Sequence, residues 1–262
     1  MTLDISCSVE RGQFALEVGL ELRAGEVVAI LGPNGSGKST LLRAIAGLQP
    51  ITTGTVALDG RMLDDGSAVF VQPRDRAVGV VFQDYALFPH LSVLENVAFG
   101  PRARGLSRAE ARRIAAEALD RLNVAELSRR RPAEVSGGQA QRVALARALA
   151  TSPEVLLLDE PMAALDVETR DAVRAQLAVQ LTAFEGIAVL VTHDPLDALL
   201  LADRVVVLES GRVVQDGTPA DLAERPQSDY VAALMGVTLV RGTAAGTTLI
   251  IDADGGVLHL AN

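Results

Sequence analysis

Four nearly continuous apolar runs mark the strands expected at the centre of the fold. They cover residues 27–31, 155–158, 187–191 and 204–208. Runs without alternation are typical of strands that are buried on both faces of a parallel sheet. Residues 3–9 and 14–22 instead alternate between apolar and polar positions, which predicts antiparallel strands with one solvated face. The pattern therefore predicts an α/β fold with a mostly parallel central sheet and an N-terminal antiparallel β subdomain.

A helical pattern occupies the stretch between the first two of these runs. Ser107, followed by Glu110 three positions later, predicts the N-cap of a helix. The positions after it recur at helical spacing as one apolar stripe, made of Ala111, Ile114, Ala115, Ala118, Leu119 and Leu122. We expect residues 88–154 to form an inserted helical subdomain, with residues 1–87 and 155–222 forming the core. The arginines of this stretch are expected to form a solvated face.

The last part of the chain has a weaker pattern. Residues 236–248 are rich in glycine, threonine and alanine, and two short apolar segments follow at 248–251 and 257–260. Because turn-forming residues separate these segments, they predict a small β appendage. Residues 223–262 are therefore expected to be a C-terminal extension.

Composition narrows the classes of function. Hydrophobic residues make up 49% and charged residues 22% of the 262 positions, as in ordinary globular proteins. The net charge of -9 and the low aromatic content of 3% argue against a nucleic-acid partner, which needs a basic face or stacking side chains. Cys7 is the single cysteine, so an internal disulfide is excluded. No apolar run reaches the roughly 18 residues of a membrane span, so a second chain would have to supply any span.

The turn after the first buried run carries a phosphate-binding pattern. It matches G-x-x-x-x-G-K-[ST], directly follows the run at 27–31 and precedes an expected helix at 41–46. Backbone N–H groups of such a turn and the helix N-terminus bind phosphate. Lys38 is expected to bridge the β- and γ-phosphates of ATP, and Ser39 to give its hydroxyl to Mg²⁺. The predicted nucleotide-binding residues are Gly32, Pro33, Asn34, Gly35, Ser36, Gly37, Lys38, Ser39 and Thr40.

Two carboxylates end the second buried run. Asp159 and Glu160 follow residues 155–158, at the sheet edge where open α/β proteins bind their ligands. Asp159 is expected to hold Mg²⁺ through water. Glu160 is the candidate general base that polarises an attacking water. Acidic residues also end strands merely to cap the next helix, and the nearby phosphate-binding turn is what favours the catalytic interpretation.

The segment Ser136, Gly137, Gly138 and Gln139, shortly before the acidic pair, resembles the signature motif of ATP-binding-cassette (ABC) ATPases. Together with Gln83 before it, Ala164-Leu165-Asp166 after the acidic pair and His193 after the third run, the order resembles that family over residues 3 to about 223. The resemblance implies a magnesium-sensing glutamine at Gln83, a D-loop aspartate at Asp166 and a switch histidine at His193. It adds Gln83 and His193 to Lys38 and Glu160 as expected catalytic residues, and Gln83 to Ser39 and Asp159 as expected metal-site residues.

The family resemblance also implies partners. ABC ATPases form head-to-tail homodimers, in which Ser136 to Gln139 of one chain would complete the ATP site of the other. Residues 83–97 resemble the part of bacterial import ATPases that grips an integral membrane permease, and Leu87 and Phe88 are expected to be exposed there. A substrate-binding protein would act through that permease, and the chain would lie at the cytoplasmic face of the inner membrane. The family usually stacks an aromatic ring on adenine in the first hairpin, but residues 9–11 offer none and Phe14 lies late.

The transported solute is the least determined feature. The short first hairpin and residues 239–244 resemble molybdate or sulfate import ATPases, which carry a C-terminal regulatory β domain. The alternatives are an import ATPase for a polyamine, iron or a sugar, and a soluble ABC ATPase acting on ribosomes or DNA. The acidic composition, the single cassette and the lack of a heptad run argue against the soluble enzyme. A P-loop kinase is disfavoured by the segment that begins at Ser136.

Overall fold

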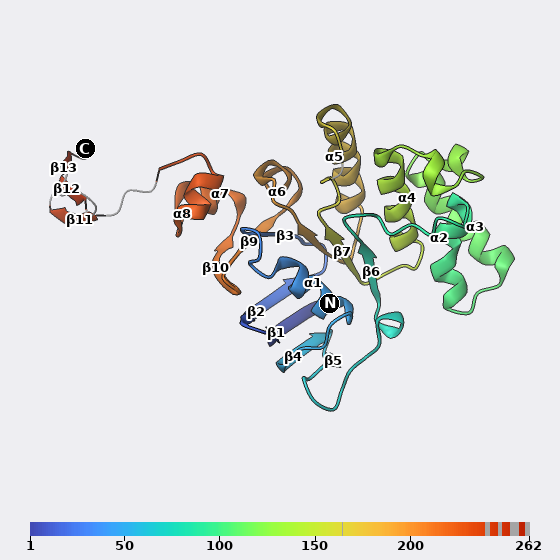
Figure 1. Cartoon of the computed structure of the whole chain (residues 1–262), viewed down its shortest axis with the longest axis horizontal. Helices are drawn as coiled ribbons and strands as arrows, with labels where there is room; N and C mark the ends of the chain where they lie inside the picture. The colour runs from blue at the N-terminus through green and yellow to red at the C-terminus, as the bar shows by residue number, and fades with distance from the viewer. Residues whose placement is uncertain (164, 239–241, 246–247, 252–256, 260–262) are drawn as a thin grey trace.

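The computed structural model describes residues 1–163, 165–238, 242–245, 248–251 and 257–259. A 10-stranded mixed sheet runs through the molecule in the order β5-β4-β1-β2-β10-β9-β3-β8-β7-β6 (Figure 1). Its strands are β1 (Thr2–Arg11), β2 (Phe14–Arg23), β3 (Val27–Leu31), β4 (Thr53–Leu58), β5 (Arg61–Asp64), β6 (Val78–Val81), β7 (Val155–Asp159), β8 (Ile187–Val191), β9 (Arg204–Glu209) and β10 (Arg212–Gly217). The predicted α/β fold is confirmed.

The parallel half of the sheet contains all four predicted apolar runs. β3 pairs with β8 and β9, and β7 pairs with β8 and β6, all in parallel. Every residue of β3 and β8 is buried, because helices cover both faces of this half. β6 at the edge was not predicted, since its four residues are only alternately buried and it contains a glycine.

The antiparallel half begins with the predicted N-terminal hairpin. β1 pairs with β2 from Thr2 opposite Arg23 to Arg11 opposite Phe14. β4 adds to the other side of β1, and β5 follows β4. Alternate residues of β1 and β2 are buried, as the alternation of the sequence predicts.

Helices α2 (Val93–Ala103), α3 (Arg108–Arg121) and α4 (Gly137–Leu149) gather at one end of the molecule (Figure 1). Ser107 is the N-cap of α3, as predicted, and its hydroxyl accepts a hydrogen bond from the backbone N–H of Glu110. The predicted apolar stripe is buried except for Ile114, which is partly buried, and it shares one hydrophobic cluster with α4 and β7. The division into subdomains itself stays a prediction.

The remaining helices are α1 (Lys38–Ala46), α5 (Val167–Thr182), α6 (Pro195–Leu201), α7 (Pro219–Glu224) and α8 (Asp229–Leu234). Leu222 of α7 and Val231 of α8 belong to the same hydrophobic cluster as Ala29 of β3 and Val205 of β9. Residues 223–234, predicted to start the extension, thus pack on the core sheet.

A separate three-stranded sheet consists of β11 (Gly242–Ala245), β12 (Thr248–Ile251) and β13 (Val257–His259). It contains the two predicted strands of the appendage. The predicted strand residue Leu260, residues 239–241 of the segment that resembles molybdate and sulfate import ATPases, and Ala164 lie outside the described residues.

Candidate functional site

The turn between β3 and α1 has a backbone shape that only glycine permits at two positions. Gly32 has φ +151°, and a Cβ there would lie 2.1 Å from the backbone oxygen of Leu208. Gly37, the N-cap of α1, has φ +107°, and a Cβ there would lie 2.8 Å from Leu16 Cδ1. No side chain of the described residues caps α1, so the N–H groups of its first turn remain available to an anion.

Lys38 lies inside this turn. Its Nζ donates hydrogen bonds to the backbone oxygens of Gly32 at 2.7 Å and Pro33 at 3.0 Å, and the residue is only 6% exposed. Burial lowers the pKa of its ammonium group, while the charges of Glu160 and Asp159 act in the opposite direction. The lysine is therefore held at the turn by carbonyl groups that a bound phosphate would compete with.

A cavity of about 540 Å³ opens in front of the turn. Its lining includes Lys38, Ser39 and Glu160, together with Arg11, Phe14 and Arg43. Ser36 Oγ is buried beside it with no hydrogen-bond partner among the described residues. A buried hydroxyl without a partner is costly, and a ligand oxygen would satisfy it. The volume, the orphan hydroxyl and the free helix N-terminus fit a nucleotide phosphate chain.

The expected metal-site residues Ser39 and Asp159 meet at this cavity. Ser39 Oγ donates to Asp159 Oδ1 at 3.4 Å, although the residues are 120 positions apart. Burial, and then the charge of Glu160, raise the pKa of Asp159 above its ordinary value. A hydroxyl and a carboxylate are oxygen donors of the kind that Mg²⁺ prefers, so the pair fits that ion.

Glu160 and His193 form the other wall of the site. Glu160 Oε2 lies 3.2 Å from His193 Nδ1, and the backbone N–H of Glu160 donates to the oxygen of Val191 at 2.9 Å. Glu160 has φ +45°, a left-handed conformation that is uncommon for a residue with a Cβ. Such conformations are frequent at functional sites, where the surrounding structure holds them.

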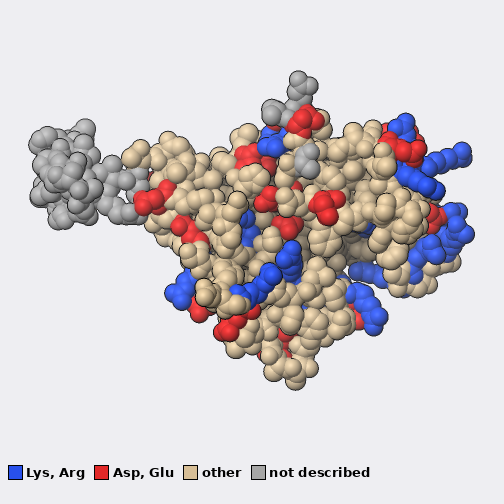
Figure 2. Space-filling view, viewed as in Figure 1, with Lys and Arg blue, Asp and Glu red and all other residues tan. Residues whose placement is uncertain are grey.

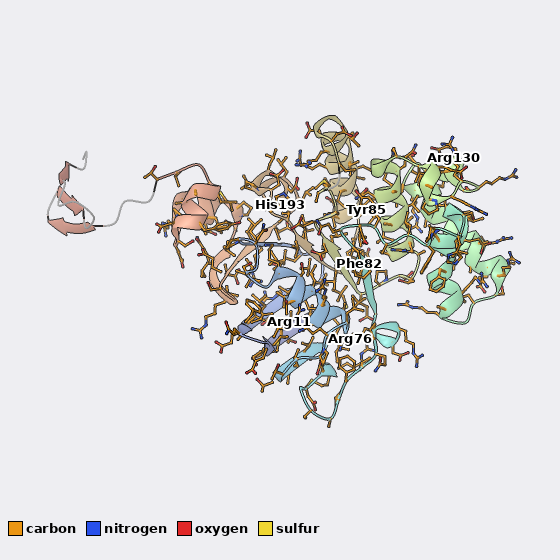
Figure 3. All side chains as sticks on the ribbon, in the orientation of Figure 1. Arg11, Arg76, Phe82, Tyr85, Arg130 and His193 are labelled. Carbon is orange, nitrogen blue, oxygen red and sulfur yellow. The ribbon has the colours of Figure 1, made fainter. Side chains whose placement is uncertain are left out.

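Gln83 lines a neighbouring cavity of about 670 Å³ rather than the one in front of the turn. The two cavities share Arg43, and Asp159 lines the second. Gln83 itself is exposed. It follows Phe82, which Figure 3 labels near the middle of the molecule, at the end of β6.

The signature segment is absent from the described lining of the cavity at the phosphate-binding turn. Ser136 is the N-cap of α4 and accepts from the N–H of Gln139 at 3.4 Å, while Gln139 Oε1 accepts from the N–H of Ser136 at 2.9 Å. In this capping box, the side chains of Ser136 and Gln139 each accept a hydrogen bond from the backbone N–H of the other. Asp166 likewise caps α5, accepting from the N–H of Thr169 at 2.9 Å. The structure therefore brings Lys38, Asp159, Glu160 and His193 together, whereas Ser136 is not among the described lining of the cavity.

Arg11 and Phe14 are site residues that sequence reasoning did not assign. Arg11 is labelled in Figure 3 at the end of β1, near α1. Phe14 is partly buried, and its ring approaches the position that a Cβ on Gly37 would occupy. The available signal was their position at the tip of the β1–β2 hairpin, which comes shortly before the phosphate-binding turn in the sequence. Arg43 was also missed, although it follows Ser39 by four positions on α1 and so shares its face.

The expectation that Leu87 and Phe88 are exposed is wrong, because both are only partly exposed. Leu87 packs against the main hydrophobic cluster. Phe88 stacks on Phe99, with ring centroids 4.6 Å apart, and Arg147 Cζ lies 5.7 Å from the Phe88 ring centroid. Phe99 on α2 is the exposed apolar residue of this region, at 47%.

Asn96 was not singled out by sequence and holds this loop in place. It is fully buried; its Oδ1 accepts from the N–H of Phe88 at 2.7 Å, and its Nδ2 donates to the oxygens of Phe88 and Ser92. A buried side-chain amide that satisfies several backbone groups of one loop restricts that loop to a single shape.

The described residues contain no cluster of three or more His, Cys, Asp or Glu side chains placed to hold a metal ion. None of their helices is both long and apolar enough to cross a bilayer.

A mostly parallel sheet with a glycine-rich turn and a buried lysine at the N-terminus of its first helix defines the class of P-loop nucleotide-binding proteins. Within that class, residues 16–163 match the ABC transporter family model, so the chain belongs to the ABC transporter family.

Relatives agree with this membership. The chain is 49% identical over 233 residues to the molybdenum import ATP-binding protein ModC of Mycobacterium tuberculosis, covering 87% of the chain and 63% of that protein. It is 46% identical over 246 residues to the spermidine/putrescine import ATP-binding protein PotA of Acidothermus cellulolyticus, covering 91% of the chain and 63% of that protein. The chain thus spans less than two thirds of the length of these relatives.

A solved structure has the same fold. The ATP-binding cassette MJ0796, in a dimeric post-hydrolysis state bound to ADP and Pi, superposes with a TM-score of 0.71 at 32% identity, covering 84% of this chain and 99% of that one.

Proposed function

We propose that the chain is the ATP-binding and ATP-hydrolysing subunit of an ABC importer, which powers solute uptake through a separate membrane permease. The observation that carries this proposal is the convergence of Lys38, Asp159, Glu160 and His193 at the cavity in front of the phosphate-binding turn and its rim. These residues come from three different segments of the chain. The names of the importer relatives support the same activity.

We assign each of these residues a role in ATP hydrolysis. The N–H groups at the start of α1 and Lys38 bind the phosphates, and Lys38 exchanges its bonds to Gly32 and Pro33 for phosphate oxygens. Glu160 accepts the proton of the attacking water, and His193 beside it orients that carboxylate. Ser39 and Asp159, with Gln83 at the adjoining cavity, would hold Mg²⁺, which neutralises charge that develops on the phosphates.

Arg11 and Phe14 line the cavity and are far from Asp159 and Glu160 in the sequence. We assign the adenine base to Arg11 and Phe14. A guanidinium over a base ring gives cation–π attraction, and the Phe14 edge supplies apolar contact. This arrangement replaces the aromatic residue that the family places in the first hairpin.

A homodimer completes the site. In Figure 1, α4 lies apart from α1, and none of residues 136–139 is among the described lining of the cavity at the phosphate-binding turn. A second copy, placed head to tail, presents Ser136 to Gln139 to that turn. The dimeric state of the MJ0796 structure supports this assembly.

The permease contact is assigned to the surface around Phe88 and Phe99, next to the loop that begins at Gln83. An exposed aromatic residue beside a half-buried one marks an interaction surface. The chain would then lie at the cytoplasmic face of the membrane, with a substrate-binding protein acting on the other side of the permease.

For the solute, we infer an oxyanion such as molybdate or sulfate. The relatives named for molybdenum and for spermidine/putrescine match at similar identity. The permease and binding protein recognise the solute, so uptake assays with these partner proteins, comparing molybdate, sulfate and spermidine, decide among the alternatives.

The nucleotide site can be tested through an unusual property of the sequence. Lys38 is the only lysine of the chain, so an acetylating reagent has only Lys38 and the amine of Met1 as amino targets. ATP at ten times its dissociation constant should slow acetylation of Lys38 about tenfold by mass action, as measured by peptide mass spectrometry. The Met1 amine is the internal control, because it lies at Asp59, away from the turn. Equal rates at Lys38 with and without ATP would overturn the proposed site.

A further inference from the structure

An arginine pair on α5 reaches the loop that carries His193. Arg170 and Arg174 follow Asp166, the N-cap of α5, at intervals of four residues, so all three lie on one face of that helix. Arg174 Nε donates to Asp197 Oδ1 at 2.7 Å, and Arg170 forms an ion pair with Asp194 at 3.5 Å. Both aspartates belong to α6 or its N-cap, immediately after His193.

The same aspartates hold the residues on either side of His193. Thr192 Oγ1 donates to Asp197 Oδ2 at 3.1 Å, and the N–H of Asp194 donates to Thr192 Oγ1 at 3.0 Å. Arg174 also lies 3.7 Å from the carboxylate of Asp194. His193 is thus the exposed tip of a short loop whose two neighbours are fastened, through carboxylates, to α5.

The part of this network that joins Arg174, Asp197 and Thr192 is buried, whereas Arg170 and Asp194 are partly exposed. Arg174 is 6% exposed, and Asp197 and Thr192 are 3% exposed. A buried charge pair requires good geometry and further hydrogen bonds, and Asp197 uses both of its oxygens in such bonds. Arg174 also pairs with Asp171 at 2.5 Å, but among the described residues the one ion pair of the buried Asp197 carboxylate is with Arg174. Removing Arg174 therefore leaves the charge of Asp197 buried without its ion pair, so the loop would have to move to hydrate it.

The other end of the network lies at the D-loop. Arg170 donates from Nη2 to the backbone oxygen of Leu165 at 3.3 Å, directly before Asp166. Arg170 Nε is buried with no partner among the described residues. α5 therefore connects the segment at Asp166 to the loop at His193 through side chains that come from one helical face.

We propose that Arg174, through its buried pair with Asp197, is a positioning residue that holds the loop of residues 192–194 so that His193 stays beside Glu160. The arginine touches neither nucleotide nor reacting atoms. The expected effect of Arg174 on hydrolysis rests on the function proposed above, whereas its expected effect on the position of the His193 side chain does not. An ion pair that merely joined α5 to α6 would stabilise the chain without any effect on His193.

The test follows the ring of His193 by NMR in the full chain labelled with ¹³C and ¹⁵N at histidine. The chain has three histidines, and His193→Asn identifies the signal. Arg174→Met should shift the ring resonances of His193 in the direction that Glu160→Gln shifts them, and leave those of His90 in place. Adding Arg174→Met to Glu160→Gln should change little further, because the contact is already lost.

Two further variants separate positioning from plain stability. Thr192→Val removes the hydroxyl that bonds Asp197 without removing a charge, and it should shift the ring resonances of His193 in the same direction. If Arg174→Met does not fold, Thr192→Val decides the question. Arg204→Met is the control, since Arg204 makes a two-pronged ion pair with Asp216 at 2.6 Å on β9 and β10. It should cost stability and leave His193 unmoved.

Hydrolysis supplies the second readout. Arg174→Met should lower kcat by about 10- to 100-fold, the cost of misplacing a group that orients catalysis, with KM for ATP unchanged. Arg174→Lys should recover part of kcat. An unmoved His193 in both Arg174→Met and Thr192→Val overturns the proposal, as does an equal shift in Arg204→Met. If the wild-type chain hydrolyses no ATP, the proposed function fails while the His193 result still stands.

Discussion

Asp159 and Glu160 are adjacent in sequence and have different surroundings. Asp159 is the last residue of β7 and points toward Ser39, where burial and the charge of Glu160 raise its pKa. Glu160 leaves the strand in a left-handed conformation and reaches His193. Two neighbouring carboxylates at one strand end can thus serve a metal site and a proton-accepting site, because the backbone turns between them.

The raised pKa of Asp159 predicts a stability effect with a definite sign. A folded-state pKa above the ordinary 3.8 means that the neutral carboxyl favours folding, and that this contribution is lost as pH rises through the folded-state pKa. Charging this carboxyl in the folded chain therefore costs stability, so Asp159→Asn should raise the melting temperature of the nucleotide-free chain above the folded-state pKa, by roughly 2–4 °C per kcal/mol relieved. The gain should shrink as pH falls toward 3.8.

Scanning calorimetry from pH 4 to 8 would measure this effect. Asp65→Asn is the matched control, because backbone hydrogen bonds from Val69 and Ser67 lower the pKa of Asp65, and its replacement should not raise the melting temperature. A lower melting temperature for Asp159→Asn at pH 7 would contradict the expected desolvation cost.

At the scale of elements, α2 combines a buried face with the exposed side chain that we propose contacts the permease. It buries Val93, Asn96, Val97, Ala98 and Pro101 and leaves Phe99 exposed beside Phe88. Figure 2 shows Lys and Arg side chains gathered over the end of the molecule that α2 to α4 occupy, and Figure 3 labels Arg130 there. Glu95 forms ion pairs with Arg102, Arg108 and Arg112 in that region, so these three charges are tied to the surface they cover.

Phe99→Ser should uncouple the ATPase from transport. Basal ATP hydrolysis should stay within about twofold of wild type, because Phe99 is not at the phosphate-binding turn. Solute uptake by the reconstituted complex should fall at least about tenfold, as expected for a residue that anchors an interface. Val179→Ser is the control, since Val179 is 64% exposed on α5. Normal uptake by the Phe99 variant would remove the permease assignment.

At the scale of the whole molecule, the proposed head-to-tail dimer would complete an ATP site that a single chain forms only in part. The described lining of the cavity contains the phosphate-binding turn and Glu160 but none of residues 136–139. Ser136 and Gly137 are exposed at the N-terminus of α4. The N-termini of α1 and α4 would bind the same nucleotide only if the two helices came from different chains.

Mixed dimers test this composite site. A dimer of Lys38→Ala with Ser136→Arg places both lesions in one site and leaves the second intact, whereas wild type paired with the double variant has one lesion in each site. With Glu160→Gln in both chains to prevent hydrolysis, the first dimer should retain one tightly bound ATP and the second should bind neither well. ATP occupancy of purified, differently tagged dimers measures the difference. Equal occupancy in the two arrangements would mean that each chain forms its own site.

Local patterns in the sequence were sufficient for much of the fold. The four buried runs, the N-terminal hairpin and the N-cap at Ser107 are all present, because burial on both faces, alternation and capping leave signatures within a few residues. The glycines of the phosphate-binding turn were predictable for the same reason: their φ angles require glycine. Short edge strands such as β6, and the half-buried state of Leu87 and Phe88, depend on neighbours that are distant in sequence.

The sequence by itself determined the class of fold, the phosphate-binding turn and the order of the motifs, since each is a property of short segments. Only the tertiary structure decided that Ser39 meets Asp159, that Glu160 meets His193, that Arg11 and Phe14 line the cavity, and that Arg174 pairs with Asp197. Those contacts join residues from different strands and helices, and periodicity carries no information about which distant side chains a packed sheet brings together.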